Sequence, residues 1–249
     1  MAEFDTSQMT GRTAAGTRTA AIDEGLRAHM NKVYSTMSVG TLLTFLVAWA
    51  VGTSPSLLGI FRNPETLSPN ILGWIVMFAP LIMVFAFGAV IQKLSVAGAQ
   101  LFFYAFAGVM GLSMAWIFVA FTGYSIAQVF LITSIAFAGL SLWGYTTKKD
   151  ISAWGSFLIM GVIGLIVAMV VNIFLQSPAM MYAISVLGVL IFAGLTAYDT
   201  QKIKTDYLQH AASGDAEWLG KSAIMGALML YLDFINMFMF LLQLFGNRE

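Results

Sequence analysis

Residues 228–242, LMLYLDFINMFMFLL, decide the fold. With its flanking residues this stretch is long and apolar enough to cross a bilayer, which takes about 20 predominantly apolar residues. It also contains Asp233 near its middle and Asn236 three residues later. An aspartate at the centre of a membrane helix costs roughly 2.5–3.5 kcal/mol on insertion scales. Another part of the chain must therefore offset the cost of placing Asp233 there.

The composition of the whole chain is that of an integral membrane protein. Of 249 residues, 59% are hydrophobic and 10% are charged, and the mean hydropathy is +0.84. A soluble domain has about 25% charged residues, so this chain cannot cover itself with a water-compatible surface. The net charge of zero gives no indication of a nucleic-acid partner, and none is expected. The absence of cysteine excludes disulfides, thiolate catalysis and cysteine metal sites.

Seven stretches have the length and hydropathy of a transmembrane helix. Their apolar runs are continuous rather than alternating, which favours helices over a β-barrel. The sequence therefore predicts an all-α integral membrane protein with seven transmembrane helices. The spans are expected at residues 33–52, 71–92, 97–121, 125–145, 155–175, 180–201 and 222–246.

The N-terminal segment is polar and carries four basic and four acidic residues within its first 32. It has no apolar core like that of a secretory signal peptide, and it is too acidic for a mitochondrial presequence. We predict that residues 1–21 form a flexible cytoplasmic tail and that residues 22–249 form the seven-helix transmembrane domain.

The distribution of lysine and arginine predicts the orientation in the membrane. Ten of the twelve lie in the N-terminal segment or in the connections after spans two, four and six, and only Arg62 and Arg248 lie on the opposite side. Positive charge accumulates on the cytoplasmic side of membrane proteins. The N-terminus is therefore expected in the cytoplasm and the C-terminus outside.

Asp199 and Asp233 are the only acidic residues within the predicted spans. No lysine or arginine lies well inside a span, so each aspartate is the most plausible partner of the other. Asp233 lies eleven residues after Ser222, roughly 16–17 Å into its span at 1.5 Å per residue. Two carboxylates held close share one proton and titrate in two separate steps. When deprotonated, they form a hard oxygen site suited to Ca²⁺.

Each of the two helices carries a stripe of small and polar residues beside its aspartate, as expected where helices line a wet cavity. The residues predicted to line or support this cavity are Thr196, Tyr198, Asn236 and Gln243. No catalytic residue and no bound cofactor are expected. Ca²⁺ enters only as a transported ion, with Asp199 and Asp233 as its ligands.

Two other interpretations of the aspartates remain open at this point. Asp199 can instead be an interfacial carboxylate paired with Lys202, because residues three apart share a helix face. Paired intramembrane aspartates also activate water in presenilin-like proteases, whose first motif Tyr198–Asp199 matches. Their second motif needs glycines around the aspartate, whereas this chain reads LYLD, so an enzyme is not expected.

Three motifs resemble those of the Bax inhibitor-1 family, also called the transmembrane Bax inhibitor motif family. They are AYDTQKIK at residues 197–204, LYLDFINMFMFLLQLFG at residues 230–246, and the lead-in DEGLRAHMNKVYSTM at residues 23–37, which is similar to bacterial members. The resemblance covers spans one to seven in order. It implies a fold in which the C-terminal helix is central and wrapped by the other six.

The resemblance also implies a pH-regulated Ca²⁺ leak, with Asp199 and Asp233 as pH sensor and gate and protons and calcium as the partners in the bilayer. Family members carry a basic latch residue at the second helix. The corresponding VIQKLSV has no arginine, and Lys93 is the stand-in. Some bacterial relatives instead bind and restrain a membrane-anchored ATP-dependent protease, which is the alternative function. Either role implies the bacterial inner membrane.

Overall fold

Helices make up most of the part of the chain that the structure describes. The structure is a computed structural model, and it describes residues 2–63, 66, 68–211 and 214–248, with side chains from Ile22 onward. Residues 2–21 belong to α1, which begins at Ala2, and residue 1 lies outside the described residues. Whether residues 1–21 form a flexible tail stays a prediction. The helices are α1 (Ala2–Gly52), α2 (Pro55–Phe61), α3 (Ile71–Val90), α4 (Val96–Met114), α5 (Ile117–Ala120), α6 (Gly123–Thr146), α7 (Trp154–Leu175), α8 (Pro178–His210) and α9 (Ala216–Phe245).

Within the described residues, seven helical segments are long and apolar enough to cross a membrane, which confirms the predicted number of spans. The third span joins α4 to the short α5. The segments are Ile22–Gly52, Ile71–Val90, Val96–Ala120, Gly123–Thr146, Trp154–Leu175, Pro178–His210 and Ala216–Phe245.

The helices of the sixth and seventh spans are longer than the hydropathy of the sequence indicated. α8 continues to His210 rather than ending at residue 201, and α9 begins at Ala216 rather than residue 222. Asp215 caps α9, because its Oδ1 accepts a hydrogen bond of 2.9 Å from the backbone N–H of Trp218. A helix satisfies its own backbone hydrogen bonds in water as well as in lipid, so it can continue beyond the apolar segment that hydropathy detects.

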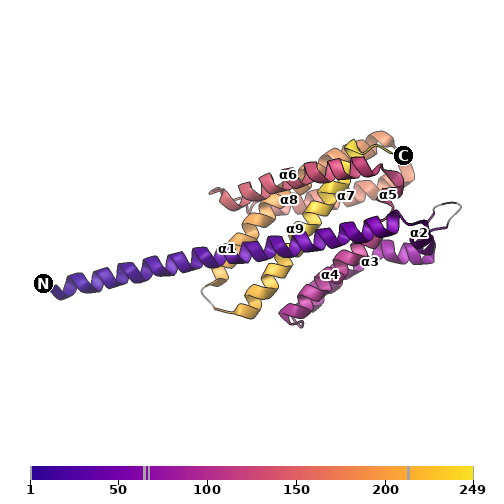
Figure 1. The fold of residues 1–249 in the computed structure, drawn as a ribbon. Coiled ribbons are helices and arrows are strands. Elements are labelled where there is room, and N and C mark those ends of the chain that lie inside the picture. The colour runs from indigo at the N-terminus through magenta and orange to yellow at the C-terminus, as the bar shows by residue number, and fades with distance from the viewer. Residues whose placement is uncertain (1, 64–65, 67, 212–213, 249) are drawn as a thin grey trace.

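The C-terminal helix α9 is the central element of the bundle, as the family resemblance implied. In the most apolar 18-residue window of α9, 72% of the residues are buried, against 11% for α3 and 17% for α7. α9 packs against α1, α4, α6 and α8, whereas α3 packs mainly on α4 and α7 mainly on α8. Figure 1 shows α9 crossing the bundle diagonally from the α8–α9 connection to the C-terminus.

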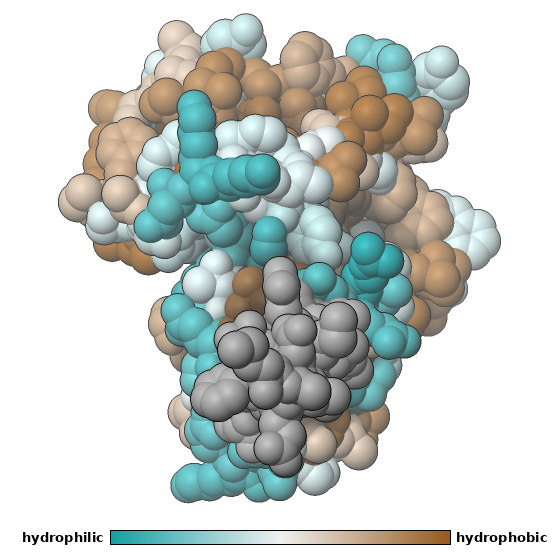
Figure 2. Space-filling view, turned by 90° about the vertical axis from the view of Figure 1, so that its left-hand side faces the viewer, coloured by the Kyte–Doolittle hydropathy of each residue, from teal (hydrophilic) through white to brown (hydrophobic). Residues whose placement is uncertain are grey.

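One end of the bundle is markedly more polar than its sides. The α3–α4, α6–α7 and α8–α9 connections lie at the end where the first span begins (Figure 1). Figure 2 views the molecule from that end and shows hydrophilic residues gathered over it, with hydrophobic residues at the sides. The distribution of lysine and arginine predicts that these connections, and therefore this end of the bundle, face the cytoplasm.

Buried polar groups on α9 are matched by partners on the surrounding helices. Tyr231 is fully buried, and its hydroxyl lies 2.6 Å from the hydroxyl of Thr44 on α1. Thr44 also donates a hydrogen bond of 2.8 Å to the carbonyl oxygen of Ala107 on α4. The ring of Tyr231 packs edge-on against Phe103 and Phe106. These contacts fix α9 against α1 and α4, because leaving a buried hydroxyl unpaired costs about 1–3 kcal/mol.

A second hydrogen-bonded chain joins α1, α6 and α8. The hydroxyl of Tyr34 on α1 lies 2.6 Å from Ser141 Oγ on α6, and Ser141 Oγ lies 2.9 Å from Thr200 Oγ1 on α8. Ser141 and Thr200 are both buried. Because Thr200 directly follows Asp199, these hydrogen bonds hold the part of α8 that carries the aspartate against α6 and α1.

α6 and α8 approach so closely at Gly144 that only a glycine fits there. A Cβ atom added to Gly144 would collide with the backbone carbonyl of Ala197 on α8. Gly111 shows the same relation, with its added Cβ 2.6 Å from the carbonyl oxygen of Thr44. Small residues of this kind let membrane helices pack backbone to backbone.

We predict that Gly144→Ala destabilises the protein, because α6 must move away from Ala197 to admit the methyl group. Overpacking costs about 1–3 kcal/mol, which lowers the melting temperature of a chain of this size by roughly 2–10 °C. Gly139→Ala is the matched control, since no atom lies within 4 Å of its added Cβ. Thermal unfolding of the detergent-purified variants measures the effect, and equal melting temperatures for the two would contradict this packing.

Candidate functional site

The structure brings Asp199 on α8 and Asp233 on α9 into direct contact. Their side chains are hydrogen-bonded to each other. Asp233 is 4% exposed, and Asp199 is partly buried. A hydrogen bond between two carboxyl groups needs a proton on one of them, so this geometry belongs to the state in which the pair holds one proton or two.

One oxygen of Asp233 accepts no hydrogen bond from an N–H or hydroxyl group of the described residues. This atom, Oδ2, is fully buried. A buried acceptor without a partner costs about 1–3 kcal/mol, and more if it carries charge. The pair is therefore an energetically costly arrangement within a membrane bundle.

Lys202 does not neutralise the pair. Its charge acts on Asp199 from one helical turn away, but the two form no ion pair in the part of the chain that the structure describes. The charge that acts on Asp233 comes from Asp199. Lys202 is therefore not the sole partner of Asp199, which also contacts Asp233.

The structure does not bring Lys93, the predicted latch, to the aspartates. Lys93 lies exposed in the turn after α3, where its backbone N–H bonds the carbonyl oxygen of Val90 at 2.9 Å. The basic residue that reaches this turn is Lys221 on α9. Its Nζ lies 2.8 Å from Glu217 Oε1 and donates a hydrogen bond of 3.1 Å to the carbonyl oxygen of Gln92. Sequence reasoning missed this contact, although the spacing of Glu217 and Lys221 is typical of a helical ion pair.

The other predicted pore residues occupy three different places. Thr196 and Asn236 lie near the pair but donate to carbonyl oxygens of their own helices, at 2.8 Å each. Gln243 lines a cavity at the far end of α9. Tyr198 packs against Gly155 on α7, so it lies on another side of α8 from Asp199. The role of these four residues stays a prediction.

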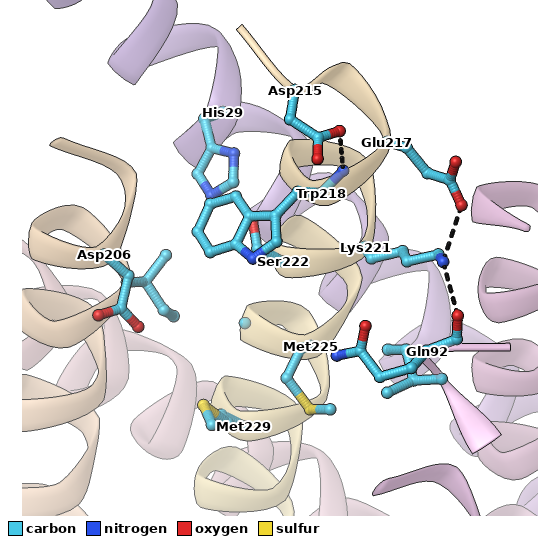
Figure 3. Close-up of a pocket in the computed structure, with 13 residues that line it drawn as sticks. His29, Gln92, Asp206, Asp215, Glu217, Trp218, Lys221, Ser222, Met225 and Met229 are labelled. Carbon is cyan, nitrogen blue, oxygen red and sulfur yellow. Dashed lines mark hydrogen bonds and ion pairs between the residues drawn. The ribbon is translucent and has the colours of Figure 1, made fainter. Parts of the chain in front are cut away.

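A cavity of about 430 Å³, here called the vestibule, opens at the polar end of the bundle. Its lining includes Ile203 and Met229, each four positions from the aspartate on its own helix, so about one helical turn separates these residues from the pair. Figure 3 shows Asp206 on the α8 side and Lys221 bridging Glu217 and Gln92 on the other. The vestibule is lined by His29, Ile91, Gln92, Ile203, Asp206, Asp215, Glu217, Trp218, Lys221, Ser222, Met225, Gly226 and Met229.

A second cavity, of about 470 Å³, lies at the opposite end of the bundle and includes Ser185 and Gln243 among its lining residues. Between this outer cavity and the aspartates, Phe192 on α8 and Phe240 on α9 stack with ring centroids 5.9 Å apart. Phe240 also lies directly against Gly188, where any added side chain would collide with the ring. We call Phe192 and Phe240 the aromatic plug.

The site offers two carboxyl groups to a cation and no preformed metal centre. Within the described residues no group of three His, Cys, Asp or Glu side chains is placed to hold a metal ion. Ca²⁺ takes six to eight oxygen ligands in proteins. Two carboxylates alone fall short of that number.

Comparison with known proteins places this architecture in a family. The family model described as "Inhibitor of apoptosis-promoting Bax1" matches residues 26–249. The inner membrane protein YbhL of Escherichia coli is 43% identical over 226 residues, which cover 90% of this chain and 94% of YbhL. A protein of Caulobacter vibrioides is 42% identical over 233 residues, and one of Rickettsia prowazekii is 41% identical over 228, each covering more than 90% of both chains. The chain is therefore a member of the Bax inhibitor-1 family of integral membrane proteins.

Proposed function

We propose that this protein is a pH-sensitive calcium leak channel of the bacterial inner membrane, gated by the proton shared between Asp199 and Asp233. The observation that carries the proposal is the buried, hydrogen-bonded pair of carboxyl groups between two long helices. The inner-membrane location rests on the name of the Escherichia coli relative YbhL.

The protonated pair keeps the channel closed. A carboxyl–carboxylate hydrogen bond joins α8 to α9, and such charge-assisted bonds are roughly twice as strong as neutral ones. The bond holds the helices at the separation at which Phe192 and Phe240 stack. While the pair holds its proton, it presents less negative charge to a cation in the vestibule.

Loss of the proton opens the channel. Two adjacent carboxylates repel each other in a medium of low dielectric constant, where charges interact more strongly than in water. The repulsion separates α8 from α9 and offers oxygen ligands to Ca²⁺. The same event weakens the aromatic plug, because its two rings are carried by the same two helices.

The proposed path of the ion runs between the two cavities. From the vestibule the path crosses the aspartates and the aromatic plug and reaches the outer cavity, which Gln243 lines. With the N-terminus in the cytoplasm, as the ten-to-two distribution of lysine and arginine predicts, the vestibule opens to the cytoplasm.

We predict that calcium flux through the reconstituted protein rises as the pH of the medium rises, because deprotonation opens the gate. Flux into vesicles loaded with a Ca²⁺-sensitive dye, at equal pH on both sides, measures this. Asp233→Asn should give a low flux that does not respond to pH, since the amide donates to Asp199 permanently and cannot ionise. Asp199→Asn should behave in the same way.

Asp150→Asn is the control for these variants, because Asp150 is exposed in the α6–α7 connection, where it accepts a hydrogen bond from Ser152 N–H. Hydrogen bonding by Ser152 holds the pKa of Asp150 below its ordinary value, so this group is ionised throughout the pH range of the assay. The control should keep the response of the unmodified protein. A flux that ignores pH and survives Asp233→Asn would exclude the mechanism.

We also predict that Phe240→Ala raises the flux at low pH several-fold, because it removes half of the aromatic plug while the aspartates stay bonded. Truncation of a buried phenylalanine costs about 3–5 kcal/mol of stability, so Phe240→Leu, which loses less volume, accompanies it. Phe157→Ala is the control, since Phe157 is 69% exposed on α7. An unchanged flux through folded Phe240→Ala and Phe240→Leu proteins would show that the plug does not close the path.

A further inference from the structure

A cleft of about 490 Å³ lies between α1 and α6, apart from the aspartates and both cavities of the ion path. α1 packs mainly on α4 and α9, and α6 packs mainly on α8 and α9, so a space is left between α1 and α6 that forms the cleft. We propose that this lateral cleft binds one anionic glycerophospholipid, with the phosphate at Arg27 and one acyl chain along the apolar walls.

The floor of the lateral cleft is apolar and rigid. Met30 and Phe137 are 3% and 7% exposed, and Ser141 between them is held by its hydrogen bonds to Tyr34 and Thr200. Because the polar groups of Tyr34 and Ser141 satisfy each other, the floor presents mainly carbon atoms to an occupant. A volume of this size falls within the range of about 300–1,000 Å³ found for ligand pockets.

The rim of the lateral cleft opens sideways toward the lipid. Leu142 is 63% exposed, and Ala138, one turn earlier on α6, is also exposed. Within a membrane span, an exposed helix face is exposed to acyl chains. A lipid tail can therefore enter from the bilayer without crossing water, a route closed to a soluble ligand.

Charge marks one end of the lateral cleft as a head-group site. Arg27 lines the cleft six residues before Val33, where the sequence predicts that the first span begins, so it lies on the head-group side of the apolar segment, and it forms no ion pair with a described residue. Lys204 adds a second cation behind the cleft. Its Nζ donates a hydrogen bond of 2.8 Å to the carbonyl oxygen of Tyr145 and lies 5.1 Å from the centre of that ring. Basic pockets between membrane helices on the cytoplasmic side bind anionic head groups.

The dimensions of the lateral cleft favour a whole lipid over a free phosphate ion. Tyr34, at the apolar end, lies seven positions after Arg27 on α1, a distance of about 10 Å along the helix. A free phosphate ion would satisfy Arg27 and leave the walls along this distance uncovered. A lipid matches both parts of the cleft, because its anionic head group can lie at Arg27 while its acyl chain runs along the apolar walls.

Native mass spectrometry of the full chain tests the proposal. The protein is released from micelles that contain equal amounts of phosphatidylglycerol and phosphatidylcholine, and the retained lipid is counted. We expect one tightly retained phosphatidylglycerol, and Arg27→Gln should lower its retention relative to phosphatidylcholine about fivefold. Lys148→Gln, which removes an exposed charge from the loop after α6, should leave the retention unchanged.

A second pair of variants tests the acyl-chain wall. Ala138→Phe fills the cleft from its exposed rim and should abolish the tight retention, whereas Leu131→Phe, at a position 61% exposed elsewhere on α6, should not. Glycerol phosphate carries the head-group charge without chains and should not displace the lipid. Retention unaffected by both Arg27→Gln and Ala138→Phe would overturn the proposal, and displacement by glycerol phosphate would show a simple phosphate site instead.

Discussion

The hydrogen bond between Asp199 and Asp233 is the interaction on which the rest of this structure depends. It is the point at which α8, the helix with the most extensive packing on α9, meets the central helix through ionisable groups. The bond places a carboxylate in the interior of the bundle with no paired cation among the described residues, and it exists only while the two groups hold a proton. The separation of two long helices is thereby coupled to proton concentration.

The contacts around the aspartates determine which helices can move together when the pair loses its proton. α9 is fixed to α1 and α4 by the Tyr231 hydroxyl and the rings around it, while α8 packs on α6 and α7, closely enough at Gly144 to exclude a side chain. The aspartate bond therefore joins two groups of packed helices. A change at the pair is transmitted to Phe192 and Phe240, because the plug lies two helical turns further along the same two helices.

Much of this arrangement follows from the cost of burying charge, and for that reason the sequence predicted it. An aspartate in an apolar span needs a partner, and Asp199 was the only other acidic residue within a predicted span. Long apolar runs likewise predicted seven spans, because spanning a bilayer requires them. The motifs around the aspartates and their resemblance to a known family added the central position of α9. These expectations rest on composition and spacing, which tertiary structure does not alter.

Other features depend on how the helices rotate and pack, which spacing does not reveal. Among many phenylalanines, nothing in the sequence distinguishes Phe192 and Phe240 as neighbours. Lys93 is close to the expected latch position in sequence, yet its side chain is exposed, while Lys221 contacts the α3–α4 turn from another helix. Tyr198 adjoins Asp199 in the chain but packs on α7, because adjacent residues of a helix point in directions about 100° apart.

Infrared difference spectroscopy of the reconstituted protein tests the central claim most directly, because a protonated carboxyl group has its own carbonyl stretching band. The shared proton predicts such a band that disappears as the pH rises, over the range in which calcium flux increases, and that is absent from both Asp199→Asn and Asp233→Asn. A band that persists in either variant, or one that disappears without any change in flux, would contradict a gate built on this pair.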